Sequence, residues 1–362
     1  MILRKIAYIF ILLPLFSCFK SFSQADTAKR KLLVLPVITR SIETDWSFGA
    51  VGSYTFHYGK KDTLVRTSNQ QALALYSLKK QLITAFNGSI YFPGEKYILN
   101  DQFSFSYFPD KFWGLGKSTP ESNEESYTFK QYYVYLHFLT AIKKNLFAGV
   151  IFEYQNLLKI DYSKNGLFDK ENITGRNGYK ISGLGLSLTY DNRKNAFSPD
   201  KGSFIQVYFN HFMPVIGSDY SYTNIVMDVR QYYRIYKQQV LALQLYNFIN
   251  LGSQVPLRSL ASLGGANSMR GLFDGRYRDK NQLVLQAEYR MHVTGRFGAV
   301  VFAGTGDVGH TVTDYSLSCL KYSYGAGLRF AVDKKEKLNI RLDYGVAGRH
   351  NNGLYFQLGE AF

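Results

Sequence analysis

One stretch of the chain has the spacing of a nucleotide-binding loop. Gly304-Thr-Gly-Asp-Val-Gly309 spells G-x-G-x-x-G, in which glycines would let the backbone approach a pyrophosphate at the start of a helix. The stretch lies inside a segment with the pattern of a strand, and no helix pattern follows it. Because the motif works only at a strand-to-helix turn, we expect neither dinucleotide binding here nor any other cofactor.

The side chains that commonly carry out hydrolysis or hold metal ions are dispersed. They form no H-E-x-x-H pair and no G-x-S-x-G elbow. The spacing of the histidines also differs from that of metal ligands. We therefore expect a protein that is not an enzyme and that has no metal site. The histidines are His57, His137, His211, His292, His310 and His350.

The composition suits strands at a membrane interface better than membrane helices. The chain contains 29 Tyr and 28 Phe but only 2 Trp, and such rings favour sites with one apolar and one wet side. Gly is frequent (31) and Pro is scarce (8), as expected of many strands that bend and turn. The mean hydropathy is slightly negative, as in a transmembrane barrel, where half of each strand faces a polar lumen.

The chain is strongly basic, with a formal net charge of +16. The basic residues are scattered singly, so nucleic acid is not an expected partner. Contact with anionic lipid or lipopolysaccharide would explain the charge, as would a lumen that handles anionic or unfolded chains, or simply a solvated basic surface. Of the two cysteines, Cys18 lies in the N-terminal segment and Cys319 is alone after it, which leaves no disulfide framework.

The N-terminal segment has the three parts of an export signal. Two basic residues precede the apolar run Ile6–Phe16, and a small-x-small cleavage site ends at Ser23. The run is too short to cross a bilayer as a helix, and no later stretch offers the roughly 18 consecutive apolar residues that such a helix needs. We predict a signal peptide over residues 1–23, with lipidation at Cys18 as the alternative.

Most of the remaining chain alternates between apolar and polar residues. In Leu283–Val293 the odd positions are apolar and the even positions are mostly polar or charged, and similar patterns occur in Leu184–Tyr190, Tyr322–Val332 and Leu338–Val346. A period of two indicates strands with one face in apolar surroundings and the other in water. Such stretches cover about 9–12 residues, the length that a tilted strand needs to cross a bilayer.

Three features favour a membrane barrel over a soluble sandwich. The chain carries an export signal, the polar face of strand after strand carries charges, and short connections alternate with long ones, as in outer-membrane barrels. We therefore predict an all-β fold, a transmembrane antiparallel barrel in the outer membrane of a Gram-negative bacterium. The short turns are Thr294–Arg296, Asp333–Lys337 and the region around Lys237, and the long loops are Leu158–Tyr179, Asn250–Lys280 and His310–Ser318.

The strand count and the domain limits follow from this pattern. About fifteen segments have the pattern of a strand. Both chain ends should lie on the periplasmic side, which requires an even number, so we expect sixteen strands with the missing one between Asp110 and Tyr135. The first strand is predicted near Trp46. Residues 24–45 would then be a short periplasmic segment, too short for a folded domain, and residues 46–362 would form the barrel.

The longest loop carries a recognisable motif. Leu263-Gly-Gly-Ala-Asn-Ser-Met-Arg270-Gly271-Leu272 precedes a strand that contains Glu288-Tyr-Arg290. This arrangement resembles the signature loop of the Omp85 family, whose core is the tetrad (V/x)-R-G-(F/Y) after a Gly-Gly pair and before an E-(Y/F)-R strand. The tetrad here lacks its aromatic residue, although Phe273 follows directly. The other residues that the resemblance assigns to the signature loop are Gly264, Gly265, Ser268, Met269 and Leu272.

Four further segments resemble the same family in order and spacing. Residues 191–203 resemble its D-x-R…P-x-x-G periplasmic turn, and residues 302–309 resemble its F-x-D-x-G strand, with the Phe displaced. Residues 324–343 resemble the strands before the last. Residues 353–362 resemble the terminal strand, whose closing aromatic residue the barrel-assembly machinery reads. The residues assigned to that terminal signal are Tyr355, Leu358 and Phe362.

The resemblance also implies a role for Arg270. In the family, the signature loop folds into the lumen and its arginine pairs with acids on the barrel wall. By strand parity, Glu288 and Asp307 point into the lumen, where a guanidinium fork can form charge-assisted bonds with both. Gly271 lets the backbone turn tightly. We hypothesise that Arg270, Glu288 and Asp307 lock the loop; the alternative is an exposed loop arginine beside turn glycines.

Two classes of function are compatible with the sequence. The resemblance implies a barrel whose first and last strands meet weakly and open sideways, so that a protein or lipid inserts or crosses. The sequence lacks the periplasmic POTRA domains of the assembly and secretion members, so this role would need a separate periplasmic partner. The alternative is a passive pore or structural surface antigen with the loop as a plug. Outer-membrane lipid, lipopolysaccharide and the barrel-assembly machinery for its own insertion are the other expected partners.

Overall fold

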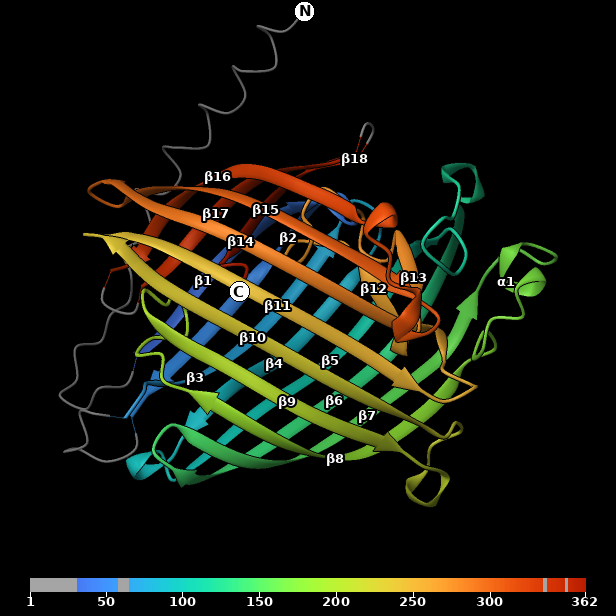
Figure 1. The fold of residues 1–362 in the computed structure, drawn as a ribbon, viewed down its shortest axis with the longest axis horizontal. Coiled ribbons are helices and arrows are strands. Elements are labelled where there is room, and N and C mark those ends of the chain that lie inside the picture. The colour runs from blue at the N-terminus through green and yellow to red at the C-terminus, as the bar shows by residue number, and fades with distance from the viewer. Residues whose placement is uncertain (1–30, 58–64, 335–336, 349–350) are drawn as a thin grey trace, which may run out of the picture.

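The strands close into one antiparallel barrel, as predicted (Figure 1). The computed structural model describes residues 31–57, 65–334, 337–348 and 351–362. The predicted signal peptide over residues 1–23 and the alternative lipidation site Cys18 lie outside the described residues. The predicted all-β class and the count of sixteen barrel strands are confirmed.

Barrel strands that follow one another in the chain are also neighbours in the barrel, and fourteen of these pairs are joined as direct hairpins. In the remaining pair, β11 and β14, the connection contains β12 and β13, which form a separate small sheet. The barrel strands are β1 (Lys31–Ser41), β2 (Asp45–Phe56), β3 (Ser68–Ser77), β4 (Leu82–Tyr91), β5 (Tyr97–Phe112), β6 (Glu125–Lys143), β7 (Leu146–Asp161), β8 (Tyr179–Asp191), β9 (Gly202–Phe212), β10 (Tyr222–Tyr236), β11 (Gln239–Leu251), β14 (Asn281–Thr294), β15 (Phe297–Gly309), β16 (Lys321–Asp333), β17 (Leu338–Ala347) and β18 (Asn351–Leu358). The small sheet is β12 (Ala261–Leu263) and β13 (Tyr277–Asp279).

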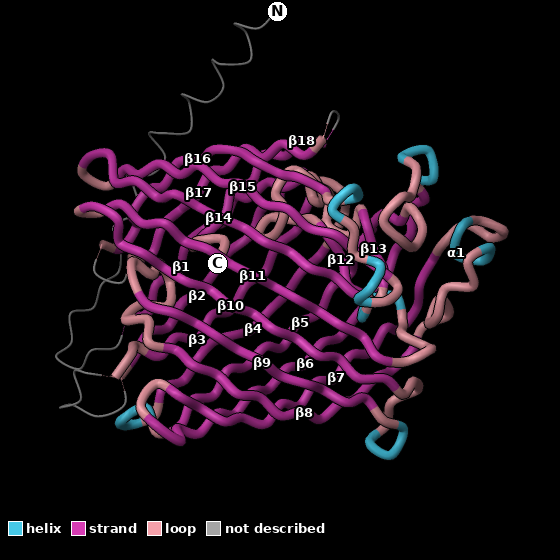
Figure 2. Tube along the Cα trace, viewed as in Figure 1, coloured by secondary structure: helices cyan, strands magenta, loops and turns pink. Residues whose placement is uncertain are grey.

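The helices are short and lie in the connections (Figure 2). None of the helices in the described part of the chain is long and apolar enough to cross a bilayer. They are α1 (Leu167–Lys170) and the 3-10 turns η2 (Pro93–Glu95), η3 (Glu121–Asn123), η4 (Pro214–Ile216), η5 (Leu257–Ser259), η6 (Val312–Asp314) and η7 (Leu317–Cys319).

The start of the barrel differs from the sequence prediction. Residues 24–45 were expected to form a periplasmic segment before a first strand near Trp46, but β1 occupies residues 31–41 and pairs along its length with β2. The interval Asp110–Tyr135 contains the end of β5, a loop and the beginning of β6, and no additional strand. The strand missing from the sequence count is therefore β1. Its alternation is interrupted because Pro36 and successive aliphatic residues stand where polar residues were expected.

Apolar and polar side chains lie on opposite faces of the strands, as the period of two predicts. On β8, Leu184, Leu186 and Leu188 are exposed on the outside, whereas Ile181 is buried inside. On β14, the lumen-facing Glu288 is buried. Apolar side chains thus cover the outside, and polar side chains line much of the lumen, which is the distribution that a bilayer around an aqueous interior selects.

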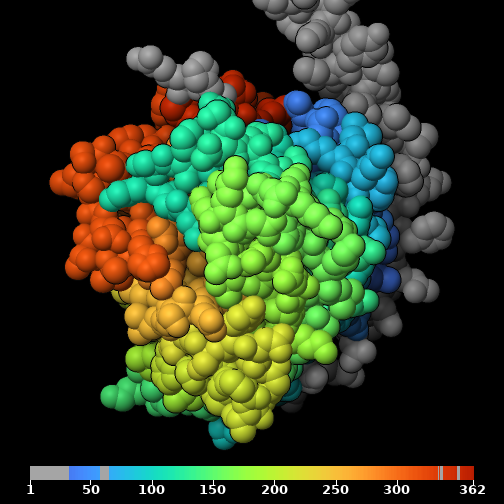
Figure 3. Space-filling view, turned by 90° about the vertical axis from the view of Figure 1, so that its right-hand side faces the viewer, coloured from blue at the N-terminus to red at the C-terminus, as the bar shows by residue number. Residues whose placement is uncertain are grey.

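The two ends of the barrel differ. Four long connections, residues 113–124, 162–178, 252–280 and 310–320, lie at one end, called the loop end below. Figure 3 looks onto this end, where these loops pack side by side. The other end, called the turn end, carries tight connections such as residues 144–145 and 295–296. The connections that were predicted to be short lie at the turn end and those predicted to be long lie at the loop end, but residues 42–44 and 78–81 form short turns at the loop end and residues 192–201 form a long connection at the turn end.

Each end also has its own packing inside the barrel. At the loop end, aromatic rings such as Phe112 and Phe168, with centroids 4.8 Å apart, build a buried apolar cluster. At the turn end, Arg66 reaches from the β2–β3 connection to Asp191 at the end of β8 and to Glu95, with an Nη2–Oε2 distance of 3.0 Å. Arg193 donates to the same Asp191 at 2.9 Å, so the D-x-R turn forms part of an ion-pair cluster.

Candidate functional site: the lumenal loop and the strand seam

The connection between β11 and β14 folds back into the barrel and lies against its inner wall. The pairing of β12 with β13 gives the loop a narrow base, and the segment between them, residues 264–276, carries the predicted signature residues. Leu263, Met269 and Leu272 are buried in one apolar cluster with Val284 and Val308 of the wall. Apolar burial therefore anchors the loop on both sides of its charged residue.

Arg270 is the centre of this loop and is 1% exposed. Its guanidinium forms one ion pair with Glu288 on β14 and another with Asp343 on β17, where the Nη1–Oδ2 distance is 2.5 Å. It also lies 3.5 Å from the ring centroid of Phe302 on β15. A planar fork held by two carboxylates above an aromatic face fixes both the position and the orientation of the loop.

The structure thus brings Glu288, but not Asp307, together with Arg270, and the locking of the loop by these residues stays a hypothesis. Asp307 lies on β15 five residues beyond Phe302, close to the loop end. There its carboxylate accepts hydrogen bonds from the backbone N–H groups of Val308 and Ser316, and it lies 4.0 Å from Lys117. The loop crosses the lumen at the level of Phe302, so the second carboxylate comes from β17 instead.

The arginine and its acids belong to a wider charged network. Arg290 Nη2 lies 2.8 Å from Glu288 Oε2, and Arg329 also pairs with Asp343. Glu360, beyond the end of β18, accepts from Arg329 Nε at 2.8 Å. Burying charges is costly unless each is paired and hydrogen-bonded. In the docked loop, each charged group of this network has at least one partner of opposite charge, and Arg270 is the partner that the loop supplies.

The backbone of the loop lies directly on β17. Gly271 has a φ of +109°, and a Cβ atom placed on it would lie 2.8 Å from the carbonyl carbon of Val346. A Cβ atom on Gly345 would lie 2.5 Å from the carbonyl oxygen of Arg270. Glycine at both positions is what permits this approach. Gly345 was not recognised in the sequence, because a glycine within a strand pattern does not reveal what approaches it.

Strand β18 and the β1–β2 turn, both beside the seam, also contact the loop. The backbone N–H of Gly271 donates to the Tyr355 hydroxyl on β18 at 2.9 Å. The N–H of Asp274 donates to Glu43 Oε1 in the β1–β2 turn, also at 2.9 Å. Burial raises the pKa of the Glu43 carboxyl above its usual value. Glu43 was not among the predicted site residues, since nothing in its local sequence indicates contact with residue 274.

We expect the Tyr355 contact to be measurable. Tyr355→Phe keeps the buried ring and removes the hydroxyl, so the Gly271 N–H loses its acceptor. A buried unsatisfied N–H costs about 1–3 kcal/mol. The heat needed to unfold the barrel in SDS, followed as the shift between folded and unfolded gel bands, should therefore fall modestly. Tyr344→Phe, on the outer face of β17, serves as the control, and an equal effect of both changes would contradict the contact.

The other predicted loop residues lie where the motif implied. Gly265 N donates to the Leu272 carbonyl at 3.1 Å, which closes the loop on itself, and Met269 N donates to Gln286 Oε1 at 3.0 Å. A Cβ atom on Gly264 would lie 2.1 Å from the Phe273 carbonyl oxygen. Ser268 is half-buried.

The residues assigned to the terminal signal separate in space. Tyr355 is fully buried and faces the lumen, while Leu358 pairs with Ile340 at the end of β18. Phe362 is 6% exposed and packs inside the barrel against Val240 and Ala242 of β11. The chain therefore turns inward after β18, at Gly359, whose φ is +88°. Recognition of these residues by assembly machinery stays a prediction.

The barrel closes at a seam with little pairing. β1 is in register with β2 from Lys31 to Ser41, but its pairing with β18 has one register position, Arg40 opposite Phe356. The Thr39 hydroxyl adds a bond to the Phe356 carbonyl. Because β18 ends at Leu358 and the chain then turns inward, the part of β1 toward the turn end faces no ladder from β18. The seam is thus the weakest junction of the barrel.

The described residues offer no alternative centre for metal chemistry, since no group of three or more His, Cys, Asp or Glu side chains among them is placed to hold a metal ion.

Comparisons with solved structures agree with this fold. BamA from Haemophilus ducreyi lacking POTRA domains 1-3 matches with a TM-score of 0.58 and 12% identity, over 92% of this chain and 70% of that one. CdiB from Acinetobacter baumannii matches with a TM-score of 0.58 and 11% identity, over 91% and 65%. CdiB from Escherichia coli gives 0.59 and 11%, over 92% and 67%. At such identities the likeness concerns the fold.

The family is identified by a comparison of the sequence with family profiles. Curated proteins include no match to this chain. The sequence profile described as the Omp85 superfamily domain matches residues 68–362, from the start of β3 through the lumenal loop to the last residue. The chain therefore belongs to the Omp85 superfamily and is a bacterial outer-membrane β-barrel.

Proposed function

We propose that this protein helps other polypeptides insert into or cross the outer membrane of a Gram-negative bacterium by opening sideways at the seam between β1 and β18. The observation that carries the proposal is the single register position between these strands, against full ladders elsewhere in the barrel. Membership of the Omp85 superfamily and the likeness to BamA and CdiB barrels support the same role.

The physical basis is the free edge of β1. Backbone N–H and C=O groups that face hydrocarbon without partners cost several kcal/mol each, so a strand that supplies partners is strongly favoured there. An extended segment of a client can pair along such an edge, as in β-strand addition. The alternating pattern of an outer-membrane strand would at the same time place its apolar face toward lipid.

The lumenal loop connects the two sides of this seam. It contacts β17 through Arg270 and Asp343, β18 through Gly271 and Tyr355, and the β1–β2 turn through Asp274 and Glu43. Separating β18 from β1 must therefore stretch or break one of these contacts. In the proposed function, the contacts of the loop stabilise the closed barrel until a client strand pairs with β1.

The partners follow from the proposed orientation. The loop end would face outward, where lipid and lipopolysaccharide surround the barrel, and the turn end would face the periplasm. A separate periplasmic protein would deliver the client to the turn end, and the barrel-assembly machinery would insert the chain itself. No enzymatic step is part of this role.

Covalent closure of the seam tests the proposal. Arg40→Cys with Phe356→Cys, in a Cys319→Ser background, places two thiols at the register position of β1 and β18. The probe client is urea-unfolded wild-type chain, diluted onto liposomes that contain the variant. Its folding is read as the heat-shiftable gel band. Oxidised seam cysteines should reduce client folding toward the rate of empty liposomes, and reductant should restore it.

The matched control is Val301→Cys with Ala326→Cys, a register pair between the fully laddered β15 and β16. Its oxidation should leave client folding unchanged. Equal client folding with an open and a closed seam would overturn the proposal. A steady open conductance of the purified barrel in a planar bilayer would, in that case, support the passive pore.

A further inference from the structure

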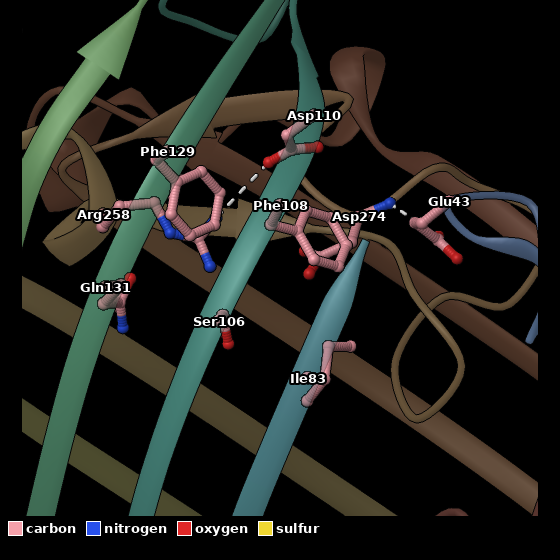
Figure 4. A pocket seen from close by; sticks show the side chains of 9 residues that line it. All are labelled: Glu43, Ile83, Ser106, Phe108, Asp110, Phe129, Gln131, Arg258 and Asp274. Atoms are coloured by element: carbon pink, nitrogen blue, oxygen red, sulfur yellow. Dashed lines mark hydrogen bonds and ion pairs between the residues drawn. The ribbon is translucent and has the colours of Figure 1, made fainter. Parts of the chain in front are cut away.

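The lumen contains a polar chamber on the wall opposite the seam. Its volume is about 380 Å³, and it is bounded by the inner faces of β5–β7, β9–β11 and β14 and by the loop segment 258–262. The seam function uses none of its side chains. A smaller pocket of about 170 Å³ adjoins it at the loop end and shares Gln131 and Arg258 (Figure 4).

The chamber contains a carboxylate without a counter-ion. Glu153 on β7 lines it, and its oxygens accept hydrogen bonds from the Asn210 amide at 2.9 Å and from the Tyr133 hydroxyl. Within the described ranges, no Lys, Arg or His nitrogen lies within 4.0 Å of it. The charged neighbour in the lining, Arg258, is turned to Asp110, at 3.5 Å, and stacks on Phe129 (Figure 4).

Other acceptors in the chamber also lack donors. The amide oxygens of Gln131 and Gln282 are buried without a hydrogen-bond partner, and both residues line the same space. Buried acceptors are normally paired, so an unpaired set needs an explanation. The chamber thus offers one carboxyl group without a counter-ion and two neutral acceptors without donors, while the cation in its lining, Arg258, pairs with Asp110 and keeps an unpartnered Nε.

We propose that this chamber is a binding site for a small organic cation that carries a primary ammonium group. An ammonium has three donors and no acceptor, which complements one carboxylate and two amide oxygens. Its attraction to Glu153 is strengthened because the surroundings are less polar than bulk water. The rings of Tyr208 and Tyr246 complete the wall and suit a cation better than an anion.

The site is separate from the proposed insertion role. The chamber faces strands between β5 and β14, whereas β1 and β18 close the barrel on the far side. Binding of the cation needs no client and no opening of the seam. A failure of the seam experiment therefore leaves this proposal intact, and the reverse also holds.

The test uses the full barrel in detergent micelles and two matched probes. Ethanolamine carries an ammonium where ethylene glycol carries a hydroxyl, and neither partitions strongly into micelles. Saturation-transfer NMR titrations should show saturable binding of ethanolamine and at least about tenfold weaker binding of ethylene glycol, since a hydrogen bond to a charged group contributes a factor of that order. Glu153→Gln keeps the shape and should weaken ethanolamine binding by a similar factor.

Asp228→Asn is the matched control. Asp228 also faces the lumen, but Arg230 and Gln244 already occupy its carboxylate, at 2.6 and 2.9 Å. This variant should bind ethanolamine as the wild type does. The proposal is overturned if ethanolamine does not bind, if both probes bind equally, if Glu153→Gln keeps full affinity, or if Asp228→Asn loses as much. Heat-shiftable bands of both variants confirm that the barrels are folded.

Discussion

Replacing Arg270 by alanine should undock the lumenal loop and lower the stability of the barrel by about 3 kcal/mol, because removing one partner of a buried ion pair leaves the other uncompensated. The loss stays at the lower end of the usual range, since Arg290 and Arg329 still contact Glu288 and Asp343. Two measurements check the result. The gel-shift temperature in SDS should fall, and trypsin should cleave at Arg276 or Arg278, which are shielded in the docked loop.

Two further variants separate charge from geometry at this position. Arg270→Lys keeps the charge but cannot bridge two carboxylates with a planar fork, so we expect an intermediate loss. Arg296→Ala removes an exposed arginine that contacts carbonyl groups at a turn, and should leave the loop docked. An Arg270→Ala barrel with unchanged shift temperature and unchanged trypsin pattern would show that the pairs do not hold the loop.

Gly345→Val should displace the loop without altering any charge. A side chain at this position meets the backbone of Arg270 and Gly271, which cannot rotate away as a flexible side chain could. Overpacking of this kind costs about 1–3 kcal/mol. Gly271→Ala should be worse, because its φ of +109° adds strain of about 1–3 kcal/mol to the clash with Val346. Both variants should expose the loop to trypsin, as Arg270→Ala does.

The control for these variants is Gly52→Ala on β2. A Cβ atom there meets nothing within 4 Å, so the barrel should keep its shift temperature. If Gly345→Val matched Gly52→Ala in both assays, the contact between the loop and β17 would contribute nothing to docking. Because the glycine variants leave Arg270 in place, they also show whether the ion pairs alone can hold a loop whose backbone is pushed from the wall.

The C-terminal motif predicted the last strand but did not predict where the final residue lies. The pattern of residues 353–362 correctly predicts a last strand, and Tyr355 and Leu358 do alternate between lumen and outer face. Phe362, however, is buried against β11 across the lumen. This placement follows from the turn at Gly359 and from the ion pairs of Glu360 with Arg290 and Arg329. Both arginines are far from Glu360 in the sequence.

The acids that pair with Arg270 also show which features a sequence pattern can predict and which it cannot. Parity alone identifies Glu288, Asp307 and Asp343 as lumen-facing, because a period of two assigns each residue to a face. Parity does not give height along the barrel. Strand tilt and register bring Asp343 to the level of Arg270 and leave Asp307 near the loop end, where it accepts from Ser316. The choice between two equivalent acids is therefore a property of the closed barrel.

The amino-acid sequence by itself determined the class of this protein. Alternating polarity, an aromatic-rich composition and connections of alternating length describe a barrel with lipid outside and water inside, since each is a local consequence of that solvent arrangement. Only the tertiary structure decided that residues 31–41 form a barrel strand, that Asp343 is the second acid paired with Arg270 and that Glu153 has no counter-ion. These depend on which strands lie opposite one another after closure, and closure joins residues whose separation along the chain leaves no local trace.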